Sequence, residues 1–412
     1  VQKSEPFVIK ADLWNDALAN EDLDQLEFIA GIKPFFELFY NSIAGFYLLL
    51  HQIRSVMNHP ELILHTVPLG TAGMFKISQY LNSRFRLVPT DYQIDLFVKF
   101  LRGNNDSNAS HLRVDIAFPS QQVLHTLTER NIPSFQVSGY PCRLGILKSS
   151  EQLFSSDEET RTKKREDDQK VLSIQGVDVV HDRIVFIMMG TLHRSWSKLS
   201  KIVRMIAELS DSLAPSNGRL HVFLAQAFEV NSETKEVVSQ GRVGAEVLAQ
   251  QVDARLLELK RNGSRFVFHP LGWVKENDVA VLMRHSVTVC KGGGGTVAEL
   301  VAMDGQAVFD TTVSHALEWE KYAIRWMEER GRGEGIFELG NNSDQLISAL
   351  ERAFAQKEKR EKSYYAPILK NHFHLDWLYS VLVDTISSTL SSEATTFSNT
   401  QLRNEEFSYM AE

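Results

Sequence analysis

The stretch KGGGGTVAEL, residues 291–300, sets the interpretation of this sequence, and it lies between two apolar runs, SVTVC and VAMDGQAVF. Glycine loses more backbone freedom on folding than any other residue, so four in a row are costly unless something requires them. The order of strand, glycine turn and helix predicts that amide groups at the helix start are open to an anion, usually a phosphate. A tight turn that only packs against its neighbours is the alternative.

The helix after the glycines carries a glutamate that adds information. Glu299 lies one helical turn beyond Thr296, so the two side chains share a face near the helix start. A glutamate buried in the apolar helix VAELVAM needs hydrogen-bond donors, and a ribose diol could supply them. The alternative is an exposed glutamate that the helix dipole favours. The spacing matches neither a P-loop nor the G-x-G-x-x-G pattern of dinucleotide-binding folds.

The composition is that of a globular protein with two domains. The chain has 412 residues, 43% of them hydrophobic and 23% charged, which is too long for one comfortable core. A formal net charge of −8 argues against nucleic acid as a partner. Two cysteines, Cys142 and Cys290, have no metal-like spacing and favour a reducing compartment. No apolar run is long enough to span a bilayer, so the expected location is the cytoplasm, with peripheral membrane contact as an alternative.

Short apolar strands alternate with helical patterns, which predicts an α/β fold with parallel sheets covered on both faces. The predicted strands are PFVIKADLW, ELILHTVPL, FRLVPTD, VDIAFPS and FQVSGYP in the first half, and DRIVFIMMG, RLHVFLAQ, FVFHPLG, SVTVC and QAVFDTT in the second. The mixed-charge run SSDEETRTKKREDDQK predicts a solvated helix or a linker between domains. The expected parts are an N-terminal domain (1–150), a charged linker (151–180), a C-terminal domain (181–355), further helices (356–392) and a mobile tail (393–412).

Residues 268–309, from FHPLGWV to QAVF, resemble the C-terminal half of GT-B glycosyltransferases. The groups it resembles most are the monogalactosyldiacylglycerol synthases, the processive diacylglycerol glucosyltransferases and the lipid-linked N-acetylglucosaminyltransferase of peptidoglycan synthesis. They share the glycine turn followed by T-x-x-E. Residues 113–143 independently resemble the end of the family's N-terminal domain, where a strand ending in "PS", a helix and a "TG-x-P-x-R" turn follow in order. The resemblance implies a GT-B fold of two Rossmann-like domains over most of residues 5–345.

The resemblance also implies a nucleotide-sugar donor, for which UDP is the favoured nucleotide, bound in the C-terminal domain. The glycines would face its diphosphate, Glu299 its ribose, and Trp273 and Val274 its nucleobase. Arg143 matches an arginine that reaches the diphosphate, and IMMGTLHRS (187–195) matches a second phosphate-facing loop. A core aromatic, a surface cation and a simple turn are the corresponding structural alternatives. The predicted donor-binding residues are Arg143, Gly190, Thr191, Trp273, Val274, Gly292, Gly293, Gly294, Gly295, Thr296, Glu299, His315, Glu318 and Glu320.

Neither a metal nor a cofactor is implied, because amide groups, a helix dipole and an arginine can stabilise the charge on a departing diphosphate. The sequence departs from the family in three places. SHALEWEKY replaces G-Q-E-x-x-N, so His315, Glu318 and Glu320 stand where residues position the donor sugar, which implies an altered sugar preference or none. The motif T-D-x-x-x-x-H-P keeps only its first two residues. PFVIKADLW resembles the family's second strand, so the first strand and its glycine- and histidine-containing loop are not among these residues.

Asp91 and His65 are then the catalytic candidates, with a strand-end cap and a core histidine as their alternatives. The leading hypothesis is an inverting glycosyltransferase acting on a lipid or lipid-linked acceptor. Residues 33–54, rich in aromatic residues and leucine, are either a buried helix or a surface for the membrane or acceptor. Alternative functions are a nucleotide-sugar-binding subunit or pseudoenzyme that needs a partner chain or an upstream segment, a UDP-sugar 2-epimerase, and a transferase that modifies a protein.

Overall fold

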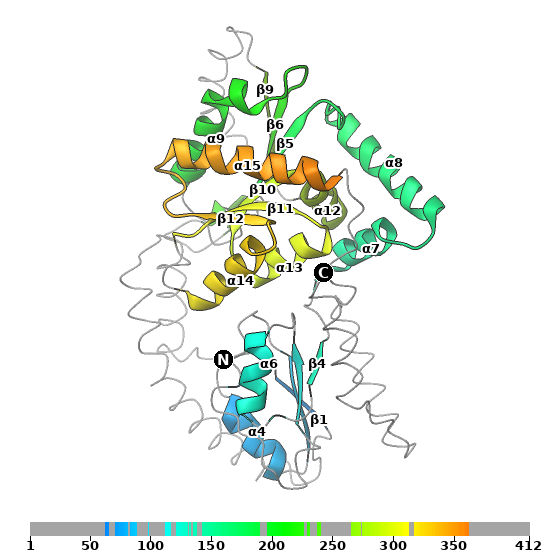
Figure 1. Cartoon of the computed structure of the whole chain (residues 1–412), viewed down its shortest axis with the longest axis vertical. Helices are drawn as coiled ribbons and strands as arrows, with labels where there is room; N and C mark the ends of the chain where they lie inside the picture. Colours follow the sequence, from blue (N-terminus) through cyan, green and yellow to red (C-terminus); the bar gives the residue numbers. More distant parts are fainter. Residues whose placement is uncertain are drawn as a thin grey trace. The chain divides into compact units, whose positions relative to one another are not determined.

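A computed structural model of the chain describes residues 62–65, 71–80, 83–88, 98, 112–116, 121–130, 132, 135–137, 142–189, 196–225, 229–230, 237–239, 265–272, 274–312 and 317–361. The chain divides into two compact units, Val1–His374 and Leu375–Glu412, and every described residue belongs to the first. Figure 1 labels the helices and strands. The predicted strand PFVIKADLW, the aromatic segment 33–54 and the tail 393–412 lie outside the described residues.

The N-terminal part contains a parallel sheet with its own apolar core. Its four strands follow one another in sequence order, with a helix after β1 and another after β3, which confirms the predicted strands of this half from ELILHTVPL onward. Phe85, Leu112 and Leu127 are among the buried side chains of this core. The strands are β1 (Leu62–His65), β2 (Arg84–Leu87), β3 (Leu112–Ile116) and β4 (Phe135–Val137), and the helices are α4 (Thr71–Tyr80) and α6 (Gln121–Glu129).

A six-stranded parallel sheet, in the order β12-β11-β10-β5-β6-β9, organises the C-terminal part. In its central strand Ile184 and Phe186 face one core and Val185 and Ile187 the other, because successive side chains of a strand point to opposite faces. Both faces are buried, which explains the continuous apolar runs in the sequence. The strands are β5 (Arg183–Met188), β6 (Leu220–Ala225), β9 (Phe266–Gly272), β10 (Val287–Lys291), β11 (Gln306–Asp310) and β12 (Gly333–Ile336).

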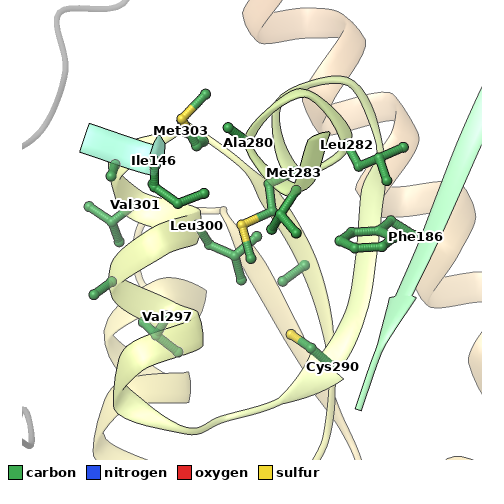
Figure 2. Close-up of a cluster of buried hydrophobic side chains, with 14 of the residues drawn as sticks. Ile146, Phe186, Ala280, Leu282, Met283, Cys290, Val297, Leu300, Val301 and Met303 are labelled. Carbon is green, nitrogen blue, oxygen red and sulfur yellow. The ribbon is translucent and has the colours of Figure 1, made fainter. Parts of the chain in front are cut away.

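Helices cover both faces of this sheet, as the α/β class predicts. One face packs against α7 (Leu144–Leu153), α12 (Glu276–His285), α13 (Gly294–Ala302) and α14 (Glu318–Glu328), and the other against α9 (Trp196–Glu208), α10 (Ser210–Leu213) and α15 (Ser343–Glu361). Figure 2 shows the first of these cores, in which Ile146, Met283 and Val297 come from three different helices and meet Phe186 and Cys290 of the sheet. The sequence made no prediction for α7, α14, α15 or β12. A separate antiparallel pair joins β7 (Glu229–Val230) to β8 (Val237–Ser239).

The mixed-charge run folds as a helix, α8 (Glu158–Ile174), that carries mostly exposed side chains. Asp157 caps it, since its carboxylate accepts from the amides of Glu159 and Thr160 at 3.4 and 3.0 Å. Its buried positions are mainly ionic, because Lys164 pairs with the buried Asp168. Among the helices that the structure describes, none combines the length and the apolar character that a bilayer crossing requires.

Candidate nucleotide-binding site

The glycine turn connects β10 to α13, which confirms the predicted order of strand, turn and helix. Gly293 is the N-cap residue of α13 and contributes no side-chain cap. The helical hydrogen bonds begin with Val297, whose amide donates to the Gly293 carbonyl oxygen at 3.0 Å. The amides before Val297 belong to the first turn and have no acceptor within the helix. No acidic side chain lies in this first turn. The positive end of the helix dipole is therefore not neutralised by the helix itself.

The glycines of this turn differ in whether a side chain would fit at their positions. None of the four has a positive φ. A Cβ atom on Gly292 would lie 2.5 Å from Ile324 Cγ1 and 3.3 Å from the Glu320 carbonyl oxygen, so α14 approaches too closely for a side chain. Among the described residues, and apart from the backbone of α13 itself, a Cβ atom on Gly293 or Gly295 would meet no atom within 4 Å. Packing within the chain thus explains Gly292, whereas Gly293 and Gly295 face open space.

The glycine turn begins at the topological switch point of the sheet. β10 and β5 are adjacent parallel strands, with Cys290 opposite Met188. From β5 the sheet continues through β6 to β9 on one side, and β10, β11 and β12 lie on the other. Open α/β sheets bind ligands at the carboxyl ends of strands where the strand order reverses in this way. The other predicted phosphate-facing segment, 187–195, begins in β5, so both predicted loops start from this one point of the sheet.

Glu299 is buried and forms a bidentate ion pair with Arg143. Arg143 Nε donates to Glu299 Oε1 at 2.5 Å and Nη2 to Oε2 at 2.7 Å. The Arg143 side chain is 34% exposed and that of Glu299 10%. Burial works against the charge of Arg143, but the hydrogen bonds and charge of Glu299 outweigh it and raise the arginine's pKa. The alternative of an exposed Glu299 is therefore wrong, and its hydrogen-bond donor in this structure is an arginine rather than a ribose.

Two further contacts hold Arg143 beside α13. Arg143 is the N-cap residue of α7. Two residues later, the amide of Gly145 donates to Glu276 Oε2 of α12 at 2.9 Å. Ser150 Oγ donates to the Ala302 carbonyl oxygen at the end of α13 at 2.7 Å. The helix that follows the predicted P-x-R turn is thus fixed on both helices of the candidate site. Glu276 was not predicted from the sequence, although an acidic residue in a first helical turn is a recognisable signal because it interacts favourably with the helix dipole.

A second ion pair at the carboxyl ends of the strands was also missed. Asp310 ends β11, is 1% exposed, and lies 2.6 Å from Lys198 Nζ of α9. Thr312 Oγ1 donates to the other carboxylate oxygen at 2.6 Å. Burial raises the pKa of Asp310, but Lys198 and Thr312 together hold it below its usual range. The pair connects the first turn of α9 with the end of β11. Its only sequence signal was an aspartate at the end of an apolar strand.

The cysteines near the site are not candidate nucleophiles. Cys142 directly precedes Arg143, and Lys291 separates Cys290 from the first glycine of the turn. Both cysteines are buried free thiols. Burial raises the pKa of each thiol well above its usual range. Among the described residues, no three His, Cys, Asp or Glu side chains gather as a group that could hold a metal ion.

The structure describes one of the two catalytic candidates. His65 ends β1 and is buried, with Nε2 3.1 Å from Thr71 Oγ1 and its ring centroid 5.9 Å from that of Phe85. This environment suits a structural histidine, and a catalytic role stays a prediction. Val274 packs at the edge of the core of α7, α12 and α13, and Glu318 begins α14. The predicted residues Asp91, Gly190, Thr191, Trp273 and His315, and the side chain of Glu318, lie outside the described residues.

Comparison with known proteins gives distant structural matches only. No protein-family model matches the chain, and no curated protein matches it in sequence. MurG of Acinetobacter baumannii is 12% identical, with 79% of this chain and 74% of that chain covered and a TM-score of 0.44. Trehalose 6-phosphate synthase of Burkholderia multivorans is 13% identical, with 93% and 84% covered and a TM-score of 0.43. The calicheamicin glycosyltransferase CalG4 is 11% identical, with 75% and 69% covered and a TM-score of 0.41. These matches extend over most of the chain, but function must be argued from the site itself.

A partly buried chain of titratable groups crosses the sheet from β5 toward β9. His221 Nε2 lies 3.1 Å from Asp182 Oδ2, and His221 Nδ1 lies 2.9 Å from His269 Nε2. A carboxylate only accepts, so His221 donates to Asp182 through Nε2 and accepts from His269 through Nδ1. His269 also stacks on Phe223, with ring centroids 4.1 Å apart. Burial, with a contribution from His221, lowers the pKa of His269 to about 4.

His269 is therefore expected to make stability depend on pH in mildly acidic solution. Between about pH 6.5 and 4 the unfolded chain binds a proton at this position that the folded chain does not, so stability falls as pH falls through this window. His269→Gln keeps a donor for His221 and removes the titration. Urea unfolding at pH 7 and pH 4.5 should show roughly 1–2 kcal/mol less acid destabilisation in the variant. An identical loss in both proteins would contradict the assignment.

Proposed function

We propose that this protein is a glycosyltransferase of the GT-B type that uses a nucleoside-diphosphate sugar, with UDP as the nucleotide. The observation that carries the proposal is the common origin of the two predicted phosphate-facing loops. One follows β5 and the other follows β10, which are adjacent at the topological switch point of the sheet. Helix α13 adds first-turn amides with no capping side chain, and a Cβ atom on Gly293 or Gly295 would meet no atom of the described residues within 4 Å.

A diphosphate is the anion that fits this arrangement best. Charge develops on the diphosphate as it leaves the sugar, and amides and a helix dipole that are already oriented stabilise that charge without a cation. Arg143 supplies a guanidinium beside the same helix. In our proposal the donor exchanges partners with the ion pair, so that Glu299 accepts from the ribose hydroxyls and Arg143 turns to the diphosphate. The exchange conserves the hydrogen bonds of both side chains.

The acceptor and the stereochemistry rest on the resemblance in the sequence. We propose a lipid or lipid-linked acceptor, and an inverting reaction in which a base removes the proton of the acceptor hydroxyl while it attacks the anomeric carbon. Glu320, beside Gly292 at the start of α14, would contact the donor sugar together with His315 and Glu318. His65 and Asp91 remain the candidates for the base.

Two measurements test the function. Isothermal titration calorimetry with UDP, GDP and their sugars should show binding of UDP, and the absence of binding by every nucleotide would contradict the proposal. Mass spectrometry of a reaction with UDP-sugars and a membrane-lipid extract should show a glycosylated product. UDP binding without any product would favour the subunit or pseudoenzyme. Conversion of the UDP-sugar to its 2-epimer without an acceptor would favour the epimerase.

Gly295→Ala is expected to change stability and nucleotide affinity in opposite directions. Alanine is favoured over glycine within a helix, so the variant should gain about 0.5–1 kcal/mol of stability. A methyl group in the open space of Gly295 should obstruct a diphosphate and weaken UDP binding by at least about tenfold. Urea unfolding and calorimetry measure the two effects. Gly292→Ala serves as the matched control, because its clash with Ile324 should lower stability. Unchanged UDP affinity in Gly295→Ala would leave the glycine turn without a phosphate-binding role.

A further inference from the structure

A cavity opens at the amino ends of the strands, at the edge of the sheet opposite the proposed donor site. It has a volume of about 740 Å³ and is lined by residues of α8, α12 and α15 and by the segments that lead into β5 and β6. Figure 1 shows α8 running from α7 to the start of β5, which brings this helix to that edge. The volume lies within the range of small-molecule sites, roughly 300–1,000 Å³.

Positive charge dominates the lining of this cavity. Four basic side chains, Arg165, Arg183, Arg284 and Lys357, line it together with only two carboxylates, Asp182 and Glu358. Asp182 keeps its negative charge while it accepts from His221 and from the Arg219 amide at 2.7 Å. Arg284 is paired with Asp304 outside the lining, at 2.9 Å. The three other basic side chains still outnumber the two carboxylates of the lining. The excess of positive charge favours an anionic ligand.

The basic side chains differ in how firmly they are held. Lys357 Nζ donates to the Arg284 carbonyl oxygen at 2.6 Å and so caps α12. Arg183 binds Glu358 at 2.7 Å, but Glu358 is 51% exposed, and such a pair contributes little stability. Arg165 is exposed and has no hydrogen-bond or ion-pair partner among the described residues. An anion can therefore bind Arg165, and take over Arg183 from Glu358, without leaving a buried group unsatisfied.

Apolar side chains line the same cavity. Val180 is 77% exposed, so its side chain is open to contact with a ligand. Phe354 is only 3% exposed, and the Arg183 guanidinium lies over its ring, 4.9 Å from the ring centroid. Ile184 and Leu153 also line the cavity, but they are 2% and 6% exposed, so Val180 is the most open of these apolar side chains. A ligand that uses the whole lining needs an anionic head and an apolar body.

We propose that this cavity is a second ligand site, which binds a small organic anion with an apolar body, separately from the nucleotide sugar. The anionic group lies between Arg165, Arg183 and Lys357, and the apolar body contacts Val180. The site is built by residues that the donor site does not use, so it stands whether or not the protein transfers a sugar.

Three probes separate the chemistry of head and body. 1-Naphthyl phosphate carries both, 1-naphthol carries the body alone, and inorganic phosphate carries the head alone. Calorimetry on the full chain should show one molecule of 1-naphthyl phosphate bound, at least about tenfold more tightly than either of the others. Saturating UDP should not displace it. Absence of 1-naphthyl phosphate binding, equal affinity for 1-naphthol, or displacement by UDP would overturn the proposal.

Substitutions test whether 1-naphthyl phosphate binds in the cavity. Arg165→Glu and Val180→Asp alter exposed side chains, so both should fold, and each should weaken 1-naphthyl phosphate by about tenfold or more through charge repulsion. Lys163→Glu makes the same charge change on α8, but two residues away, on the opposite side of the helix, and should alter affinity less than twofold. Equal affinities in Arg165→Glu, Val180→Asp and the wild-type protein would show that the probe binds elsewhere and would overturn the proposal.

Discussion

Glu299→Ala is expected to weaken the binding of both UDP and uridine by at least tenfold, since our proposal assigns its carboxylate to the ribose that the two ligands share. The chain should still fold. Removing Glu299 leaves Arg143 without its partner, but that side chain is 34% exposed and reaches water. The expected loss of about 1–3 kcal/mol, the range for a polar group that loses its hydrogen-bond partner, is smaller than the stability of a typical domain. Calorimetry with each ligand and urea unfolding measure the two effects.

Arg143→Ala is the matched variant, because it breaks the same ion pair from the other side. If Arg143 binds the diphosphate, this variant should weaken UDP by about tenfold or more and leave uridine nearly unchanged. Comparing the losses of UDP and uridine affinity therefore separates a ribose-binding role of Glu299 from a diphosphate-binding role of Arg143, although the two side chains form one ion pair in the ligand-free chain. Equal losses of uridine affinity in both variants would indicate that the pair only supports the fold. Unchanged affinities in both would remove Glu299 and Arg143 from the donor site.

Asp304→Asn is expected to destabilise the protein by about 3–5 kcal/mol, the range for removing one partner of a buried ion pair. Asp304 lies in the turn after α13, where its Oδ2 binds Arg284 Nη1 at 2.9 Å and its Oδ1 pairs with Arg332. Arg332 is 2% exposed, so its charge has no access to water. Asparagine suits the positive φ of 54° at this position, so the substitution isolates the loss of charge. Urea unfolding measures the effect.

A more exposed ion pair in the same C-terminal part of the chain provides the control for Asp304→Asn. Arg352 binds Glu334, and their side chains are 54% and 33% exposed. Glu334→Gln should therefore cost less than about 1 kcal/mol. Similar losses in Asp304→Asn and Glu334→Gln would contradict the view that burial of Arg332 sets the size of the effect. A large loss in Asp304→Asn would show that the end of α13 is fixed by charge as well as by packing.

Patterns confined to neighbouring residues were predicted well. The apolar runs DRIVFIMMG and SVTVC became β5 and β10, because strands buried on both faces of a sheet are apolar throughout. The glycine turn was found by the same local logic, since it interrupts an apolar strand and a helix. Helix α8 was one of two expectations for its charged run, which has almost no apolar period. Helix α14 was not predicted, although its buried residues include Ile324, the side chain that explains Gly292.

The sequence by itself determined the α/β class, most strands and the glycine turn, and it led to the prediction that Glu299 and Arg143 bind the donor. Only the tertiary structure decided that these two side chains bind each other across 156 residues of chain, that Lys198 meets Asp310, and that β5 lies beside β10. The physical reason is the separation along the chain over which each interaction acts. Strand periodicity and turn chemistry act between neighbouring residues, whereas a buried ion pair or a strand order depends on how distant segments pack. The same packing leaves Gly293 and Gly295 facing open space and opens the cavity at the opposite edge of the sheet.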